Sequence, residues 1–128
     1  MLAILFLFAS CEQKVLDCRT LKNGKFLYHW KFGKEGVSYL IMREDSLQWE
    51  INQKTRDTST YLVRWKGECS YDLYFQKNSN DSINLHRKKS DSLPVKTEIL
   101  AITDNYYLFK AQQADLAFAL TDTLWIKK

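Results

Sequence analysis

Residues 60–75, TYLVRWKGECSYDLYF, decide the fold class. Large side chains alternate with polar ones in both halves of this stretch, at Tyr61, Val63 and Trp65 and then at Cys69, Tyr71, Leu73 and Phe75. Successive side chains of a strand point to opposite faces of a sheet, so this spacing predicts two half-buried strands. Gly67 lies between them, where we expect it to supply the positive φ of a tight turn. The polar positions are expected to face water, namely Arg64, Lys66, Glu68, Asp72 and Gln76.

The remainder of the chain predicts further strands and hence an all-β domain. Its 128 residues suffice for one domain, and an aromatic content of 14% favours strands over disorder. Besides the two strands above, we expect strands at 24–32, 37–42, 47–51, 94–102, 106–109 and 124–126, with a short one at 83–85. Residues 111–120 are interpreted as a bulged or looped connection. About eight strands joined by short turns are typical of an antiparallel meander, closed or partly open as a small lipocalin-like barrel.

The alternation also predicts which side chains enter the barrel. In the third strand we place Leu47, Trp49 and Ile51 inside, with Gln48 and Glu50 outside. The bulky residues expected in the interior are Phe26, Tyr28, Trp30, Trp49, Trp65, Tyr71 and Phe75. Rings of this size fill an eight-stranded interior rather than leave a large cavity.

The first ten residues, MLAILFLFAS, are uncharged and almost wholly apolar. They are too short to span a bilayer, which takes about 20 residues, but they match the apolar core of a secretory signal. The following Cys11 completes a motif that resembles the bacterial lipobox, although Phe8 holds the position usually taken by Leu. No Lys or Arg precedes the apolar run, which indicates a true start codon upstream. The predicted organisation is a signal peptide at 1–10, a lipidated tether at 11–23 and one β domain at 24–128.

Lipidation of Cys11 would leave Cys18 and Cys69 as an even pair in an oxidising compartment. We therefore expect a disulfide between them. The alternatives are two buried free thiols and, for the N-terminus, a buried strand in which Cys11 is structural. Two cysteines without a histidine at ligand spacing do not make a zinc site, and we expect neither metal nor cofactor.

A set of residues and motifs carries a resemblance to a known family: Cys11, Cys18, Gly24-Lys25-Phe26, Arg43, Gln48, Trp65 and Cys69-Ser70-Tyr71. The whole chain resembles small, uncharacterised flavobacterial-type lipoproteins of the Bacteroidota, which share a C…GKF…W…C-x-Y skeleton. The resemblance implies a lipid-anchored β domain and supplies no catalytic residues. Some similar proteins bear the label DNA topoisomerase IV, but this chain is far too short for strand passage. The start of the first strand also resembles the Gly-x-Trp motif of lipocalins, with Phe26 in the Trp position.

The sequence contains no GxSxG, HExxH, CxxC, P-loop or dinucleotide motif. The two histidines, His29 and His86, are expected on the surface and in a basic loop. Acidic residues at Glu44, Asp45 and Asp57 are interpreted as solvated turns rather than as a cation site. The pair Tyr106-Tyr107 is interpreted as core packing rather than as an exposed aromatic patch. A net charge of +4 with dispersed basic residues does not predict a nucleic-acid partner.

These observations predict a non-catalytic binding or scaffolding module of the cell envelope. Acyl chains on Cys11 would hold it in the outer membrane, facing the periplasm or the cell surface, with a protein, glycan or lipid partner. The first alternative is a carrier of a small hydrophobic ligand in a cavity lined by Phe26, Trp30 and Trp65. The second is a hydrolase-type enzyme in which His29 or His86 meets a carboxylate.

Overall fold

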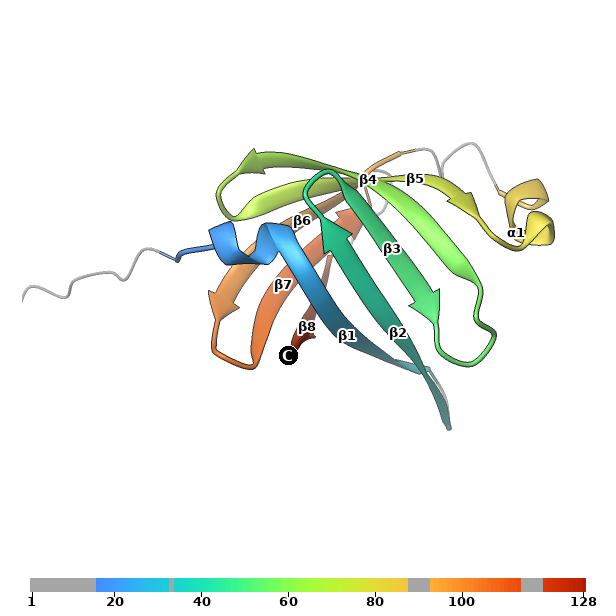
Figure 1. The fold of residues 1–128 in the computed structure, drawn as a ribbon, viewed down its shortest axis with the longest axis horizontal. Coiled ribbons are helices and arrows are strands. Elements are labelled where there is room, and N and C mark those ends of the chain that lie inside the picture. Colours follow the sequence, from blue (N-terminus) through green and yellow to red (C-terminus); the bar gives the residue numbers. More distant parts are fainter. Residues whose placement is uncertain (1–15, 33, 88–92, 114–118) are drawn as a thin grey trace, which may run out of the picture.

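Eight antiparallel strands close into one barrel in which each strand pairs with the next along the chain, and β8 returns to β1 (Figure 1). The strands are β1 (Asn23–Phe32), β2 (Glu35–Glu44), β3 (Leu47–Asn52), β4 (Thr58–Gly67), β5 (Ser70–Asn78), β6 (Val95–Ile102), β7 (Tyr106–Gln113) and β8 (Leu120–Lys127). The prediction of an all-β, eight-stranded meander is confirmed. The computed structural model describes residues 16–32, 34–87, 93–113 and 119–128, so the predicted signal peptide and Cys11 lie outside the described residues.

A two-residue turn between β2 and β3 sets the register of this pair. Asp45 adopts a left-handed φ of 50°, and its N–H donates to Asn23 Oδ1 at 3.0 Å. The turn places Gln48 opposite Arg43. Two residues further along β3, Glu50 lies opposite Ile41, which is the next inward position of β2. Directly opposed residues of antiparallel strands project from the same face. The buried Arg43 therefore requires its partner Gln48 to be inside the barrel as well.

The predicted faces of β3 are consequently wrong. Gln48 is 1% exposed, and Glu50, opposite the buried Ile41, lines an interior cavity. Leu47 is 37% exposed and Trp49 lines a groove on the outer surface. The strand has the predicted period of two, but the register imposed by the turn, and not residue polarity, selects the buried face.

The hairpin of β4 and β5 keeps its predicted alternation, with Val63 and Tyr71 buried in the core. The reversal occurs one residue later than expected, at residues 68 and 69, after a register shift between Trp65 and Gly67. Gly67 ends β4 and does not have a positive φ. Asp72 lies on the outer face, as expected, but is only 8% exposed, and its carboxylate lies 3.9 Å from Lys66 Nζ.

The predicted strand at 83–85 is wrong, because this segment forms the short helix α1 (Asp81–Leu85). Asn80 caps its N-terminus by accepting from the N–H of Ser82 at 3.1 Å. Asn84 bonds the backbone of Asn78 twice, at 2.8 and 2.9 Å, and fixes the helix to the end of β5. In Figure 1, α1 lies beyond the barrel end that is remote from the first residues described.

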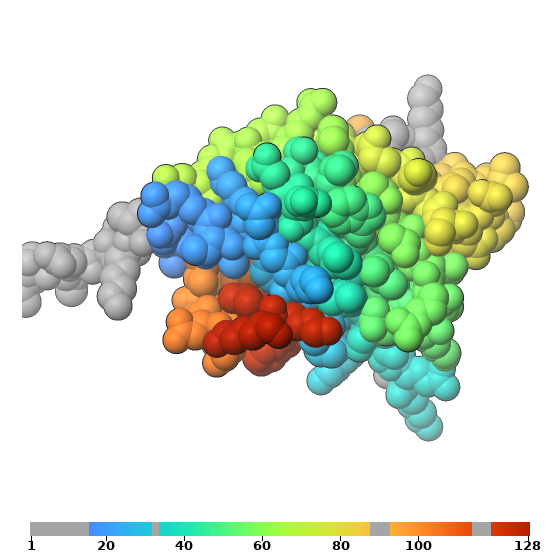
Figure 2. Space-filling view, in the orientation of Figure 1, coloured from blue at the N-terminus to red at the C-terminus, as the bar shows by residue number. Residues whose placement is uncertain are grey.

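Strands β7 and β8 take up part of the predicted connection at 111–120. Ala111 belongs to β7 and Leu120 begins β8, so β8 starts four residues before the predicted 124–126. Residues 114–118 lie outside the described residues. On the face shown in Figure 2, β8 in red lies against β1 in blue. Only three residue pairs join them in the described structure, Lys25–Leu27 of β1 with Trp125–Lys127 of β8.

The barrel end at the start of β1 is closed by the 3-10 helix η1 (Arg19–Lys22), whose Leu21 is buried in the core. The fully buried Cys18 precedes η1 and forms a disulfide with Cys69, with a Cα–Cα distance of 5.3 Å. The predicted disulfide is thus confirmed. It fastens the segment that covers the barrel end to the β4–β5 turn. No helix within the described ranges is both long and apolar enough to cross a membrane.

Because the disulfide closes a loop with a sequence separation of 51, we expect the double variant Cys18→Ser/Cys69→Ser to unfold more easily. The chain-entropy model gives a loss of about 4 kcal/mol. Urea denaturation monitored by Trp fluorescence measures it, with the wild type under reducing conditions as the matched control. Equal midpoints for the double variant and the oxidised wild type would contradict the expectation.

Candidate functional site

A buried arginine occupies the closed end of the barrel. Arg43 of β2 is 3% exposed, and its guanidinium donates hydrogen bonds in four directions. The acceptors, at 2.8 to 3.1 Å, are Gln48 Oε1, the Leu21 carbonyl, and the hydroxyls of Tyr71 and Tyr107. They come from η1, β3, β5 and β7, so one side chain joins elements from most of the chain. Arginine suits this position because its planar donors point outward in a fixed pattern.

Aromatic rings surround the same guanidinium. Its carbon lies 4.8 Å from the ring centre of Phe26 and 4.7 Å from that of Tyr71. Burial acts to lower the pKa of Arg43, but the hydroxyls of Tyr71 and Tyr107 outweigh it, and the net direction is upward. The group therefore stays charged. Burial also raises the pKa of the Tyr107 hydroxyl well above its usual value, so this partner stays neutral.

Gln48 connects the arginine to a carboxylate deeper in the barrel. Its Oε1 accepts from Arg43 Nε at 2.8 Å, and its Nε2 donates to Glu50 Oε2 at 2.8 Å. A guanidinium can only donate and a carboxylate can only accept, so the orientation of the amide between them is fixed. The three side chains form a polar line from the closed end towards the middle of the barrel.

An interior cavity of about 230 Å³ lies at the end of this line. Its described lining is mainly apolar and aromatic: Tyr28, Trp30, Ile41, Glu50, Tyr61, Tyr71, Leu73, Val95, Thr97, Phe109, Ala111, Leu120 and Leu124. The prediction of a filled interior holds only for the closed end. Because Trp49 lies outside and Glu50 inside, a carboxylate stands where an indole was expected, and space remains beside it.

The cavity environment alters the titration of its polar groups. Desolvation raises the pKa of Glu50, opposed by the hydrogen bond from Gln48 and the charge of Arg43. Burial likewise raises the pKa of the Tyr61 and Tyr28 hydroxyls, and Tyr28 donates to Asp122 Oδ2 at 3.0 Å. The phenols are therefore neutral donors at neutral pH, and Glu50 is the one carboxyl group in the described lining.

Trp30 and Leu120 lie between this cavity and a groove on the outer surface. Both line the interior cavity and also a surface groove of about 730 Å³ between β1 and β8. Trp30 is 38% exposed. The groove lies where the pairing of β1 and β8 has ended after Leu27. The cavity also shares Tyr61, Leu73 and Val95 with a second surface pocket, of about 230 Å³.

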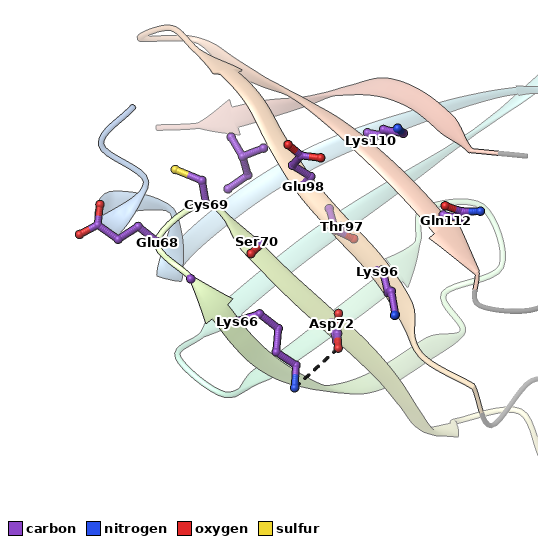
Figure 3. Close-up of a pocket in the computed structure, with 12 residues that line it drawn as sticks. Lys66, Glu68, Cys69, Ser70, Asp72, Lys96, Thr97, Glu98, Lys110 and Gln112 are labelled. Carbon is purple, nitrogen blue, oxygen red and sulfur yellow. Dashed lines mark ion pairs between the residues drawn. The ribbon is translucent and has the colours of Figure 1, made fainter. Parts of the chain in front are cut away.

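A second groove, of about 750 Å³, lies on the outer surface beside the β4–β5 turn (Figure 3). The polar side chains that line it are Lys66, Glu68, Ser70, Asp72, Lys96, Thr97, Glu98, Lys110 and Gln112. Figure 3 shows the ion pair of Lys66 and Asp72, with Lys96 close by. Charges of both signs alternate along this groove, so it presents no strong field of one sign.

The other residues considered from the sequence do not come together at one site. His29 is exposed and its Nδ1 lies 2.7 Å from Ser38 Oγ, whereas the exposed His86 ends α1. No cluster of three or more His, Cys, Asp or Glu side chains that could hold a metal occurs in the part of the chain that the structure describes. Tyr107 is fully buried, as the core-packing interpretation requires, while its neighbour Tyr106 packs on Trp125 with ring centres 5.2 Å apart.

The sequence interpretation missed Arg43, Gln48 and Glu50 as interior residues. The signal was present, because Arg43 continues the inward series of Ile41 along β2. A two-residue turn at Asp45 then fixes the pairs that carry both polar side chains of β3 inward. Pairing the residues of β2 and β3 outward from the turn would have placed Gln48 and Glu50 inside the barrel. The polarity of β3 alone predicts the opposite face.

Comparison with protein-family models, with curated proteins and with solved structures finds no match to this chain. Its function must therefore be argued from the geometry and chemistry of the barrel.

We expect Arg43→Lys to lower the free energy of unfolding by about 3 kcal/mol, because lysine cannot reach the four acceptors of the buried guanidinium. The matched control is Arg64→Lys, an exposed arginine of β4, which should change it by less than about 0.5 kcal/mol. Chemical denaturation measures both. Similar losses for the two variants would contradict the central role of Arg43.

The raised pKa of Glu50 predicts a pH dependence. Above the usual pKa of a glutamate the folded state holds this proton more tightly than the unfolded state, so stability falls as pH rises. The isosteric Glu50→Gln does not titrate, and its stability relative to the wild type should therefore increase from pH 4.5 upwards. Unfolding curves measured between pH 4 and 8 test this, and a constant difference would count against it.

Proposed function

We propose that this protein is a non-catalytic binding module of the cell envelope that holds a small, mainly apolar ligand inside its barrel. The observation that carries the proposal is the cavity of about 230 Å³ inside the barrel. Arg43 and η1 close the barrel on one side of it, while Trp30 and Leu120 separate it from a surface groove. Apolar lining with one convergent polar group is typical of small-molecule sites.

The volume restricts the ligand to a small molecule. An engineered cavity of about 150 Å³ accepts benzene, whereas pockets for drug-sized ligands measure about 300–1,000 Å³. A single ring with a short side chain suits the space available here. Of the residues named above for a carrier, Trp30 lines the cavity, whereas Phe26 and Trp65 contribute to the packing around Arg43.

Placement in the envelope is supported by two features. The sequence before residue 16 resembles a lipoprotein signal that ends at Cys11. The disulfide of Cys18 and Cys69 suits an oxidising compartment, where such bonds persist. Acyl chains on Cys11 would then anchor the barrel to the outer membrane, as in the Bacteroidota lipoproteins that the chain resembles.

A second candidate is a scaffold that docks a protein partner on its outer surface. The groove of about 750 Å³ beside the β4–β5 turn favours it. Substituting Lys96 and Lys110 with Glu would reverse two of its charges without altering the described interior cavity lining. Loss of a cross-linked envelope partner in this variant would support scaffolding.

The cavity proposal predicts binding of a neutral aromatic probe such as 2-phenylethanol to the purified protein. Ala111→Phe fills the cavity from β7 and should weaken binding at least about tenfold. Leu100→Phe, at an exposed position of β6, is the control and should bind as the wild type does. Calorimetry combined with NMR shift mapping measures affinity and location. Unchanged binding in Ala111→Phe, or shifts confined to the outer grooves, would overturn the proposal.

The anchor proposal predicts that Cys11→Ser moves the protein from the membrane fraction to the soluble fraction. The double variant Cys18→Ser/Cys69→Ser retains the lipid site and should stay with the membrane. Intact mass of the wild type from its native membranes should correspond to a chain that starts at Cys11 and carries acyl chains. A mass that retains Met1 without lipid would rule the anchor out.

A further inference from the structure

We propose that the ligand of the barrel is a small organic cation, a primary amine attached to a ring or short chain, whose ammonium group pairs with Glu50. This inference rests on the proposed function, because it names the ligand class of the same cavity. Three observations carry it: the partners of the carboxylate, the arrangement of nearby positive charge, and the nature of the cavity walls.

The carboxylate of Glu50 has one oxygen engaged and one available. Oε2 accepts from Gln48 Nε2 at 2.8 Å, and no other donor from the described residues contacts the group. Among those residues, no buried side-chain nitrogen or oxygen lacks a partner. Oε1 is therefore not sealed in the protein but is open to the cavity that Glu50 lines. A donor on a ligand can reach it there.

No cationic side chain of the described residues pairs with Glu50. Arg43 lies beyond Gln48, and its donors are directed to Gln48, Leu21, Tyr71 and Tyr107. A desolvated carboxylate without a direct counter-ion is unfavourable. The described cavity lining offers no other charged group. An ammonium on the ligand would supply the missing counter-ion, whereas a carboxylate on the ligand would be repelled.

Aromatic rings form much of the cavity wall around this carboxylate: Tyr28, Trp30, Tyr61, Tyr71 and Phe109. Ring faces attract cations, and sites for organic ammonium groups commonly combine several rings with an acid. The same rings offer an apolar surface to the remainder of the ligand. A neutral molecule of equal shape would gain the apolar contacts but not the charge pairing.

Binding should depend on pH through Glu50, and the groups that face it define the expected direction. These are Arg43 of β2 across Gln48 of β3, and the phenols of Tyr28 on β1 and Tyr61 on β4. Tyr39 of β2 influences both phenols, and Asp122 of β8 accepts from Tyr28. The phenols remain protonated as pH rises from acidic to neutral, so ionisation of Glu50 should strengthen amine binding.

Three probes of similar shape and different charge test the proposal: 2-phenylethylamine, 2-phenylethanol and phenylacetate. For the wild type at pH 7.5, calorimetry should give an affinity for the amine at least about tenfold higher than for the alcohol, with the anion weakest. Glu50→Gln should remove this preference and leave alcohol binding within about twofold of the wild type. Glu44→Gln, at an exposed position at the end of β2, is the matched control and should keep the preference.

A second measurement does not depend on a variant that must fold. In the wild type, amine affinity should rise between pH 4.5 and 7.5 while alcohol affinity stays constant. Equal affinities for amine and alcohol, or a preference that persists in Glu50→Gln, would overturn the cation assignment and leave the cavity proposal intact. Failure of all three probes to bind would overturn both.

Discussion

The buried guanidinium of Arg43 imposes the constraint on which the rest of the barrel depends. A charged group in a packed interior must have all its donors satisfied, and here the acceptors come from η1, β3, β5 and β7. Each acceptor fixes the position of its own element relative to β2. Phe26 and Tyr71 then cover the planar group from their ring faces.

This arrangement divides the interior into two halves of different character. Around Arg43 the space is filled by Phe26, Tyr71 and Tyr107, and the disulfide of Cys18 holds the covering segment in place. Beyond Gln48 the walls remain apolar, but a carboxylate replaces a large side chain. The polar line through Gln48 therefore links the filled half of the barrel to the half that contains the cavity. Rigid packing in the first half orients the chemical group offered in the second.

The fold was predictable because alternation along the strands and short turns between them are local properties of the sequence. The disulfide was predictable because Cys18 and Cys69 remain once Cys11 is assigned to lipid. The cavity was not, because Leu47 and Trp49 have the period of a buried face and lie outside. Their position is decided by a turn at Asp45 and by a charge on the neighbouring strand, and neither acts through the hydrophobicity of β3.

Local polar contacts account for the other difference. The segment after β5 contains apolar side chains at strand spacing, yet Asn80 caps a helical turn and Asn84 bonds back to Asn78. Side-chain bonds of this kind compete directly with strand pairing. The interpretation by apolar period alone gave them no weight.

The pairing of β8 with β1 also has a kinetic consequence. All other pairings join strands that follow one another along the chain. The closing pairs instead join residues 25–27 to 125–127, about 100 residues apart. Contacts of such large sequence separation form late, and a chain made from its N-terminus cannot form them until β8 has been synthesised. The hydrogen bond from Arg43 to Tyr107 likewise cannot form until β7 has been synthesised. Closure of the barrel is therefore the last pairing that the nascent chain can make, however stable the hairpins formed before it are.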